Sequence, residues 1–134
     1  MPDVLVEVRA GWLNGRQSRF LDAIHDALTS VLKHPPADKV LRLLEHAPEN
    51  FAVPHDMSDR FVRIEIVMFA GRSRETKRAL YKAIVERLLT FGVPVADAKI
   101  VLVEVAIENV GFRGGQAACD VDLGYALDVT PASA

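Results

Sequence analysis

The amino-acid sequence predicts an α/β (α+β) fold, in which a tandem β-α-β repeat forms a four-stranded, mainly parallel or mixed sheet with two helices on one face. Three features predict this class. Short motifs recur in the same order, four segments have the apolar content of strands, and two segments between them have helical periodicity. Strands joined through a helix run parallel with a right-handed crossover, so each repeat supplies one parallel pair.

The internal repeat is visible in three pairs of short segments. At offsets of 59 or 60 residues, the matched segments are 8–11 with 68–71, 36–39 with 95–98, and 44–50 with 103–109. The sequence therefore predicts pseudo-repeats over residues 2–51 and 61–112, within a single domain over residues 1–129.

The first repeat begins with a strand in which Val4, Val6 and Val8 share one face. The helix that follows carries an apolar stripe, made of Phe20, Ile24, Ala27, Leu28 and Val31. A Pro-Pro pair at residues 35–36 ends this helix, and residues 40–44 are expected to form the second strand.

The second repeat begins with a strand over residues 61–69, whose apolar face is formed by Val62, Ile64, Ile66 and Met68. A helix begins near Arg74, and its apolar stripe consists of Leu80, Ile84, Val85, Leu88 and Leu89. Gly92 and Pro94 end the helix, and residues 100–105 are expected to form the fourth strand.

The segments outside the repeats are expected to be less regular. A short hairpin is predicted in the linker over residues 52–60, and a disordered tail over residues 130–134. The two helices leave one face of an apolar sheet uncovered, and the sequence offers no third helix to cover it. Self-association would bury that face, so we expect an oligomer.

Composition excludes several classes of function. The chain has 134 residues, a net charge of −2 and a pI near 6.1, which does not suit a nucleic-acid partner. No apolar run is long enough to span a bilayer. The single cysteine, Cys119, cannot form an internal disulfide, and the four histidines lack the close spacing of metal ligands. We therefore expect a cytoplasmic protein without metal, cofactor, nucleic acid or membrane among its partners.

Three sequence features resemble those of the tautomerase superfamily (4-oxalocrotonate tautomerase-like). They are the Met1-Pro2 start, the Ala-Gly-Arg-Ser segment at 70–73, and the Lys-Arg-Ala-Leu-Tyr segment at 77–81. The long-chain branch that includes malonate semialdehyde decarboxylase is the most similar, and the similarity extends to about Gly115. The resemblance implies a homotrimer in which the mature N-terminal proline is the catalytic base or acid.

Pro2 has two interpretations. Proline is tolerated at the first position of a strand, where its missing N–H costs nothing. In a chain with the resemblance described above, it is instead predicted to be catalytic after removal of Met1. An α-amine titrates near pH 8 in water, and burial disfavours its charged form, so a buried amine could accept a proton at neutral pH.

Two arginines near the second helix are candidate substrate-binding residues. Arg72 immediately precedes the helix, where a carboxylate would meet both the guanidinium and the free N–H groups of the helix start. The alternative is a solvated arginine beside Ser73, which would act as the N-cap. Arg74 lies in the first helical turn, where it could contact the substrate or face solvent.

Asp38 and Phe112 complete the predicted site. The resemblance implies that Asp38 orients a water molecule, although Asp97 in the matched loop shows that a purely structural role is sufficient. Phe112 is expected to form part of an apolar wall that keeps the amine dry. Ala70 stands where the decarboxylase has the first arginine of an Arg-x-Arg pair, and Val110 where relatives have tryptophan.

These departures favour simple tautomerisation. The predicted function is keto–enol proton transfer on a small 2-oxo or enol carboxylate. Two alternatives remain: a malonate semialdehyde decarboxylase or hydratase-like activity, and a non-catalytic trimeric scaffold or ligand-binding protein that has kept the fold.

Overall fold

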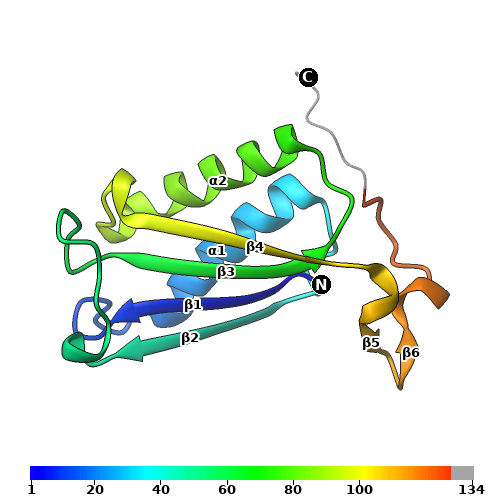
Figure 1. Cartoon of the computed structure of the whole chain (residues 1–134), viewed down its shortest axis with the longest axis horizontal. Coiled ribbons are helices and arrows are strands. Elements are labelled where there is room, and N and C mark those ends of the chain that lie inside the picture. Colours follow the sequence, from blue (N-terminus) through cyan, green and yellow to red (C-terminus); the bar gives the residue numbers. More distant parts are fainter. Residues whose placement is uncertain (128–134) are drawn as a thin grey trace.

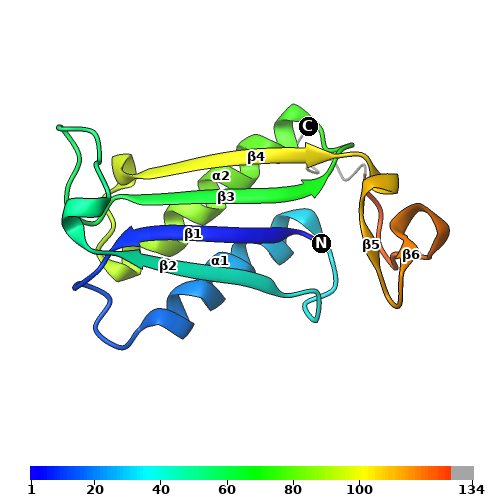
Figure 2. The same ribbon diagram turned by 60° about the horizontal axis from the view of Figure 1, so that its bottom comes forward.

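A computed structural model describes residues 1–127 of the chain. A four-stranded sheet has the strand order β2-β1-β3-β4, and both helices cover one of its faces (Figures 1 and 2). The strands of this sheet are β1 (Asp3–Arg9), β2 (Val40–His46), β3 (Val62–Phe69) and β4 (Ala98–Val105). The helices are α1 (Gln17–Leu32) and α2 (Arg74–Leu88). Short 3₁₀ turns span Pro48–Asn50, Leu89–Phe91, Val95–Asp97, Ile107–Asn109 and Ala118–Asp120.

The strand directions confirm the predicted fold class. β1 pairs with β2 in parallel, β3 pairs with β4 in parallel, and the two repeats join through the antiparallel pair β1–β3. The sheet is therefore mixed, with two β-α-β units side by side. Because β1 and β3 are the central strands, the start of β1 lies beside the end of β3.

Matched positions in the two repeats make matched backbone hydrogen bonds. Each helix-to-strand loop is closed by an aspartate N–H that donates to a proline carbonyl at 2.9 Å, Asp38 to Pro35 and Asp97 to Pro94. The glycine after each first strand has a positive φ, 109° at Gly11 and 130° at the equivalent position of the second repeat. A side chain is disfavoured at such angles, which accounts for the recurring Ala-Gly motif.

The core lies between the sheet and the two helices. The alternate valines of β1 are fully buried, as are the predicted apolar residues of β3, so the predicted strand faces are confirmed. The stripe of α2 is narrower than predicted. Leu80, Ile84 and Leu88 are buried, whereas Val85 is only half-buried and Leu89 is 48% exposed. The four-residue spacing of the buried positions fits a single helical face, and the two neighbours fall beside it.

The linker over residues 52–60 contains no hairpin, so that prediction was wrong. The chain makes a turn in which the Met57 N–H donates to the Pro54 carbonyl at 2.9 Å. Ser58 is then held against the second repeat, because its N–H donates to the Asp97 carboxylate at 3.0 Å. The segment pairs with a buried side chain rather than with itself, and Pro54 cannot donate to a strand ladder.

The chain beyond β4 adds a feature that the sequence did not predict. A small hairpin of β5 (Gly111–Phe112) and β6 (Gln116–Ala117) extends from the end of the sheet near the N-terminus (Figure 1). From β6 the chain returns toward the start of β1, where the Tyr125 hydroxyl donates to the Met1 carbonyl at 3.0 Å. The predicted disordered tail at 130–134 lies outside the described residues.

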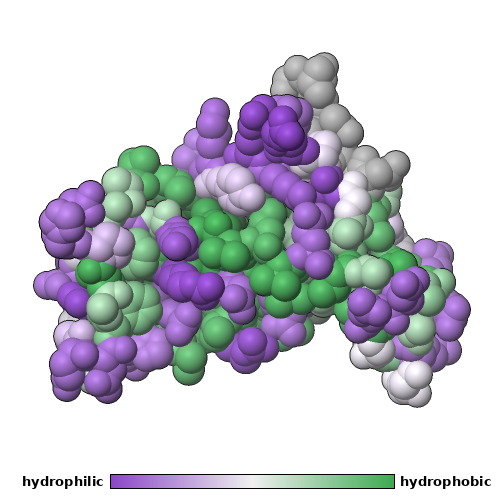
Figure 3. Space-filling model, in the orientation of Figure 1, coloured by the Kyte–Doolittle hydropathy of each residue, from purple (hydrophilic) through white to green (hydrophobic). Residues whose placement is uncertain are grey.

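The face of the sheet that the helices leave open is partly apolar. One row of paired residues across the four strands consists of Val40, Asp3, Val67 and Val103. Val40 and Val103, on the two outer strands, are 46% and 38% exposed. Figure 3 shows hydrophobic surface in the middle of the molecule, between hydrophilic side chains on both sides. Within residues 1–127, no helix is long and apolar enough to cross a membrane.

Candidate active site

The start of β1 is enclosed by three other parts of the chain. Pro2 is buried and directly precedes Asp3, which pairs with Val40 at the start of β2 and with Val67 near the end of β3. The loop that enters β2 and the loop that leaves β3 therefore meet at Pro2. The returning C-terminal segment closes the third side through Tyr125 (Figures 1 and 2).

Arg72 is buried at this end of the sheet. Its side chain is 7% exposed, and its Nε has no hydrogen-bond partner among the described residues. Its position is set by Gly71, whose φ of 130° turns the chain out of β3, and by Ser73, whose hydroxyl caps α2 by accepting from the Thr76 N–H at 3.1 Å. Burial lowers the pKa of Arg72, because removal from water disfavours the charged guanidinium. Arg72 therefore offers a buried positive charge and an unused donor.

Tyr125 connects Arg72 to the N-terminus. Its ring centroid lies 6.0 Å from the Arg72 guanidinium carbon, while its hydroxyl donates to the Met1 carbonyl. Burial raises the pKa of Tyr125, and the charge of Asp38 adds to this, while the charge of Arg72 acts in the opposite direction. The phenol is therefore neutral at physiological pH and available as a hydrogen-bond donor. Sequence analysis missed this residue.

His34 is a second buried group that sequence analysis did not single out. It is 2% exposed, and its ring lies 6.3 Å from the ring of Tyr125. Its Nδ1 is 3.1 Å from the Pro35 carbonyl, which can only accept, so Nδ1 carries the proton. Burial lowers the pKa of His34, and the neighbouring His25 and N-terminal charges act in the same direction. The neutral ring therefore presents an Nε2 lone pair, which has no partner within residues 1–127.

Asp38 belongs to the same cluster. It is half-buried in the loop before β2, and its negative charge adds to the raised pKa of Tyr125 and opposes, without reversing, the lowered pKa of His34. Its counterpart Asp97 is 4% exposed and is held by Ser58, whose N–H and hydroxyl both donate to the Asp97 carboxylate. The two matched aspartates thus differ: Asp97 fastens the linker, while Asp38 lies near the buried polar side chains at the N-terminus.

The structure does not join the remaining two predicted residues to this cluster. Arg74 is exposed at the first residue of α2, and no contact found among residues 1–127 links it to Arg72 or Tyr125. Phe112 is half-buried in β5, where its ring lies 4.9 Å from the Arg113 guanidinium carbon. The hairpin that carries Phe112 extends from the end of the sheet near the N-terminus (Figure 1), and the wall beside Pro2 stays a prediction.

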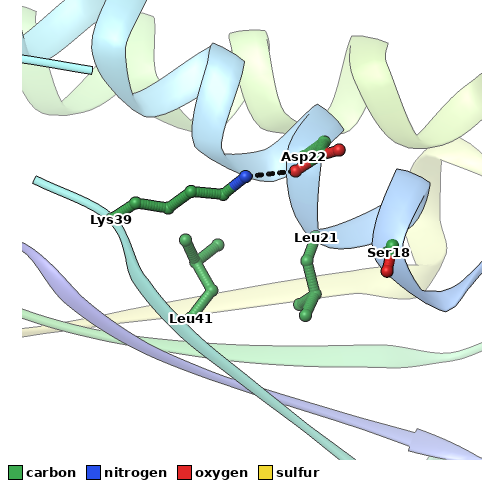
Figure 4. Close-up of a pocket in the computed structure, with 5 residues that line it drawn as sticks. All are labelled: Ser18, Leu21, Asp22, Lys39 and Leu41. Atoms are coloured by element: carbon green, nitrogen blue, oxygen red, sulfur yellow. Dashed lines mark hydrogen bonds and ion pairs between the residues drawn. The ribbon is translucent and has the colours of Figure 1, made fainter. Parts of the chain in front are cut away.

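Surface clefts elsewhere on the molecule contain none of the cluster residues. One, of about 240 Å³, lies where α1 passes β2 and is lined by Ser18, Leu21, Asp22, Lys39 and Leu41 (Figure 4). Lys39 reaches across this cleft to form an ion pair with Asp22. Two others, of about 500 and 430 Å³, lie along α2 and the start of β4. Residues 1–127 contain no group of three side chains that could hold a metal ion.

Comparison with known proteins identifies the family. A family model described as a tautomerase enzyme matches residues 38–113, which is more than half of the chain. The protein belongs to the tautomerase family. The match includes Asp38, Arg72, Arg74 and Phe112, and the resemblance predicted from the sequence is thereby confirmed.

Solved structures of tautomerase-family relatives have the same fold. FG41 malonate semialdehyde decarboxylase inhibited by 3-bromopropiolate is 30% identical, with a TM-score of 0.80 over 87% of this chain and 92% of that one. A second malonate semialdehyde decarboxylase is 22% identical, with a TM-score of 0.81 over 90% of this chain and 100% of the other. A fused 4-OT, solved as a symmetric trimer, is 24% identical, with a TM-score of 0.79 over 88% and 97% of the two chains.

Proposed function

We propose that this tautomerase-family protein transfers protons between the enol and keto forms of a small 2-oxo carboxylate, with Pro2 as the base and acid after removal of Met1. One observation carries the proposal. Pro2 is buried at the start of a central strand, beside a cluster that contains a buried arginine with an unused donor. Burial disfavours the charged form of the imino nitrogen, and a neutral amine can accept a proton.

The proton transfers balance without any further reagent. The neutral Pro2 nitrogen accepts the proton of the enol hydroxyl, and the O–H bond breaks as the C2 carbonyl forms. The C2–C3 double bond supplies the electron pair that takes the proton back from Pro2 to form a C3–H bond. The amine ends the cycle neutral, as it began.

Arg72 is proposed to bind the substrate carboxylate. Its guanidinium and the first turn of α2 both favour an anion, and the Nε has no other partner among the described residues. Arg74 is retained as a second candidate only if a neighbouring subunit presents it to the site. Phe112 stays a candidate for the apolar wall, because its hairpin extends from the end of the sheet near the N-terminus.

A decarboxylase or hydratase-like activity is the second candidate, and Asp38 is the observation that favours it. The 30%-identical solved structure is a malonate semialdehyde decarboxylase, and the negative charge of Asp38 acts on both His34 and Tyr125. In this reading Asp38 orients an attacking water molecule. Replacing Asp38 with asparagine would then abolish hydration or decarboxylation and leave simple ketonisation intact.

The third candidate is a non-catalytic scaffold or ligand-binding protein. A chain that keeps Met1 would fit it, because the nitrogen of an acylated proline has no basic lone pair. We also propose a homotrimer in the cytoplasm. Apolar residues on the open face of the sheet and the symmetric trimer of the fused 4-OT support the trimer.

The proposal is tested by ketonisation of phenylenolpyruvate or 2-hydroxymuconate, followed by ultraviolet absorbance. Pro2→Ala is the control, because alanine also permits removal of Met1 but supplies a primary amine in place of the ring nitrogen. The wild-type rate should exceed the variant rate by about 10²-fold or more. Equal rates in the two proteins would remove Pro2 from the mechanism.

A further inference from the structure

The Tyr125 hydroxyl is directed at the position next to the Pro2 nitrogen. It donates to the Met1 carbonyl oxygen at 3.0 Å. That oxygen belongs to the amide that Pro2 completes, so it lies only about 2.3 Å from the Pro2 nitrogen in a planar peptide group. In the chain that carries Met1, Tyr125 therefore binds an oxygen immediately beside the atom proposed to move the proton.

The surroundings of Tyr125 suit it to bind an oxygen on which negative charge develops. The guanidinium carbon of Arg72 lies 6.0 Å from the tyrosine ring, which places a buried cation beside it. On the other side, the buried ring of His34 lies 6.3 Å away. Donors that are fixed in a dry site stabilise developing charge more strongly than water does, because they need not reorient.

We propose that Tyr125 is a catalytic residue that donates a hydrogen bond to the 2-oxygen of the substrate, which lies near the position that the Met1 carbonyl oxygen occupies before processing and at hydrogen-bonding distance from the Pro2 nitrogen. The inference rests on the proposed function and deepens it. Arg72 binds the carboxylate and Tyr125 binds the oxygen on the adjacent carbon, so the pair recognises 2-oxo and 2-hydroxy-enol acids as a class. Pro2 remains the proton carrier.

Tyr125 does not change the proton transfers proposed above. Pro2 accepts the enol proton, negative charge builds on the 2-oxygen, and the same proton is delivered to C3. Tyr125 keeps its own proton throughout and lowers the barrier by stabilising the charged oxygen. Its effect is therefore expected in kcat, since the interaction strengthens in the transition state.

The test compares two tyrosine-to-phenylalanine variants. The sequence has only two tyrosines, and Tyr81 lies half-buried on α2 away from the cluster, so Tyr81→Phe is a matched control for Tyr125→Phe. Tyr125→Phe should lower kcat for phenylenolpyruvate ketonisation by about 10²- to 10³-fold, with a smaller rise in KM of no more than about ten-fold. Tyr81→Phe should stay within about two-fold of wild type. A Tyr125→Phe enzyme with near wild-type kcat would overturn the inference.

A binding measurement tests the inference separately from turnover. Phenylpyruvate and 3-phenylpropionate share a skeleton and a carboxylate, but only the first has a 2-oxygen. The processed wild type and Tyr81→Phe should bind phenylpyruvate about ten-fold more tightly, and Tyr125→Phe should bind both alike. If Tyr125→Phe keeps the preference, or the wild type lacks it, the inference is wrong. If the preference is as expected but no ketonisation occurs, Tyr125 binds the oxygen and the proposed function fails instead.

Discussion

The carboxylate-binding role of Arg72 can be tested with Arg72→Gln, using Arg74→Gln as a matched control. The two arginines are two residues apart, but Arg72 is 7% exposed in the loop before α2 while Arg74 is exposed on the helix. Glutamine keeps a polar side chain of moderate length and removes the charge. If the account is correct, the two substitutions differ in effect even though they are chemically identical.

The expected magnitude follows from the burial of Arg72. A hydrogen bond to a charged group contributes about 1.5–3 kcal/mol in proteins, which corresponds to about 10- to 150-fold in kcat/KM. Because the carboxylate is bound equally in the ground and transition states, most of this loss should appear as a higher KM. Arg74→Gln should lower kcat/KM by less than Arg72→Gln does, since an exposed cation is screened by water.

Folding should survive the loss of Arg72. Glu104, the acidic group whose charge acts on Arg72, keeps its own ion pair with Lys77 at 2.6 Å. Removing the arginine therefore leaves no buried carboxylate unpaired, and the Tm should fall by no more than a few degrees. The assay is steady-state ketonisation of phenylenolpyruvate with thermal unfolding of each variant in parallel. A larger KM effect for Arg74→Gln than for Arg72→Gln would refute the assignment.

Three further predictions concern stability. Burial lowers the pKa of His34, so the unfolded chain binds a proton that the folded chain does not; the stability that this residue confers should be complete above about pH 6.5 and decline as pH falls below it. In urea unfolding, His34→Gln should reduce the fall in the free energy of unfolding below about pH 6.5, and the exposed His55→Gln should not. The same pH dependence in the wild type and both variants would contradict this. Asp97→Ala should lower the free energy of unfolding by about 1–3 kcal/mol, because it removes both hydrogen bonds that Ser58 donates to the buried Asp97 carboxylate, and a loss below about 0.5 kcal/mol would argue against this link. Ser73→Ala should cost about 1 kcal/mol through loss of the α2 N-cap, measured by thermal unfolding; an unchanged Tm would show that the cap contributes nothing.

The sequence was sufficient to predict the repeated β-α-β architecture, because strand and helix periodicities differ and each repeat contained both. The buried face of α2 and the structure of the linker were predicted less accurately from the sequence. Val85 and Leu89 are apolar and lie next to true core positions, so the sequence alone does not separate them from the buried stripe of α2. The linker over residues 52–60 was predicted to pair with itself, and its actual partner, Asp97, is distant in sequence.

In the candidate site, some residues are placed by the topology of the sheet and others only by tertiary packing. Pro2, Asp38 and Arg72 lie at strand or helix ends, and topology alone brings these ends to one edge of the sheet. Tyr125 lies in a segment without periodicity, so nothing in the sequence indicated that it returns to the N-terminus. His34 precedes a Pro-Pro pair that predicts only the end of a helix, and its burial depends on packing against Tyr125 and His25.

The proposed mechanism requires an active chain that begins at Pro2. Intact-mass spectrometry of the purified protein, on the same samples used for ketonisation, tests it most directly. We expect a species that lacks Met1, and activity in proportion to the fraction of that species. A preparation that keeps Met1 on every chain and still ketonises phenylenolpyruvate at the full rate would contradict it.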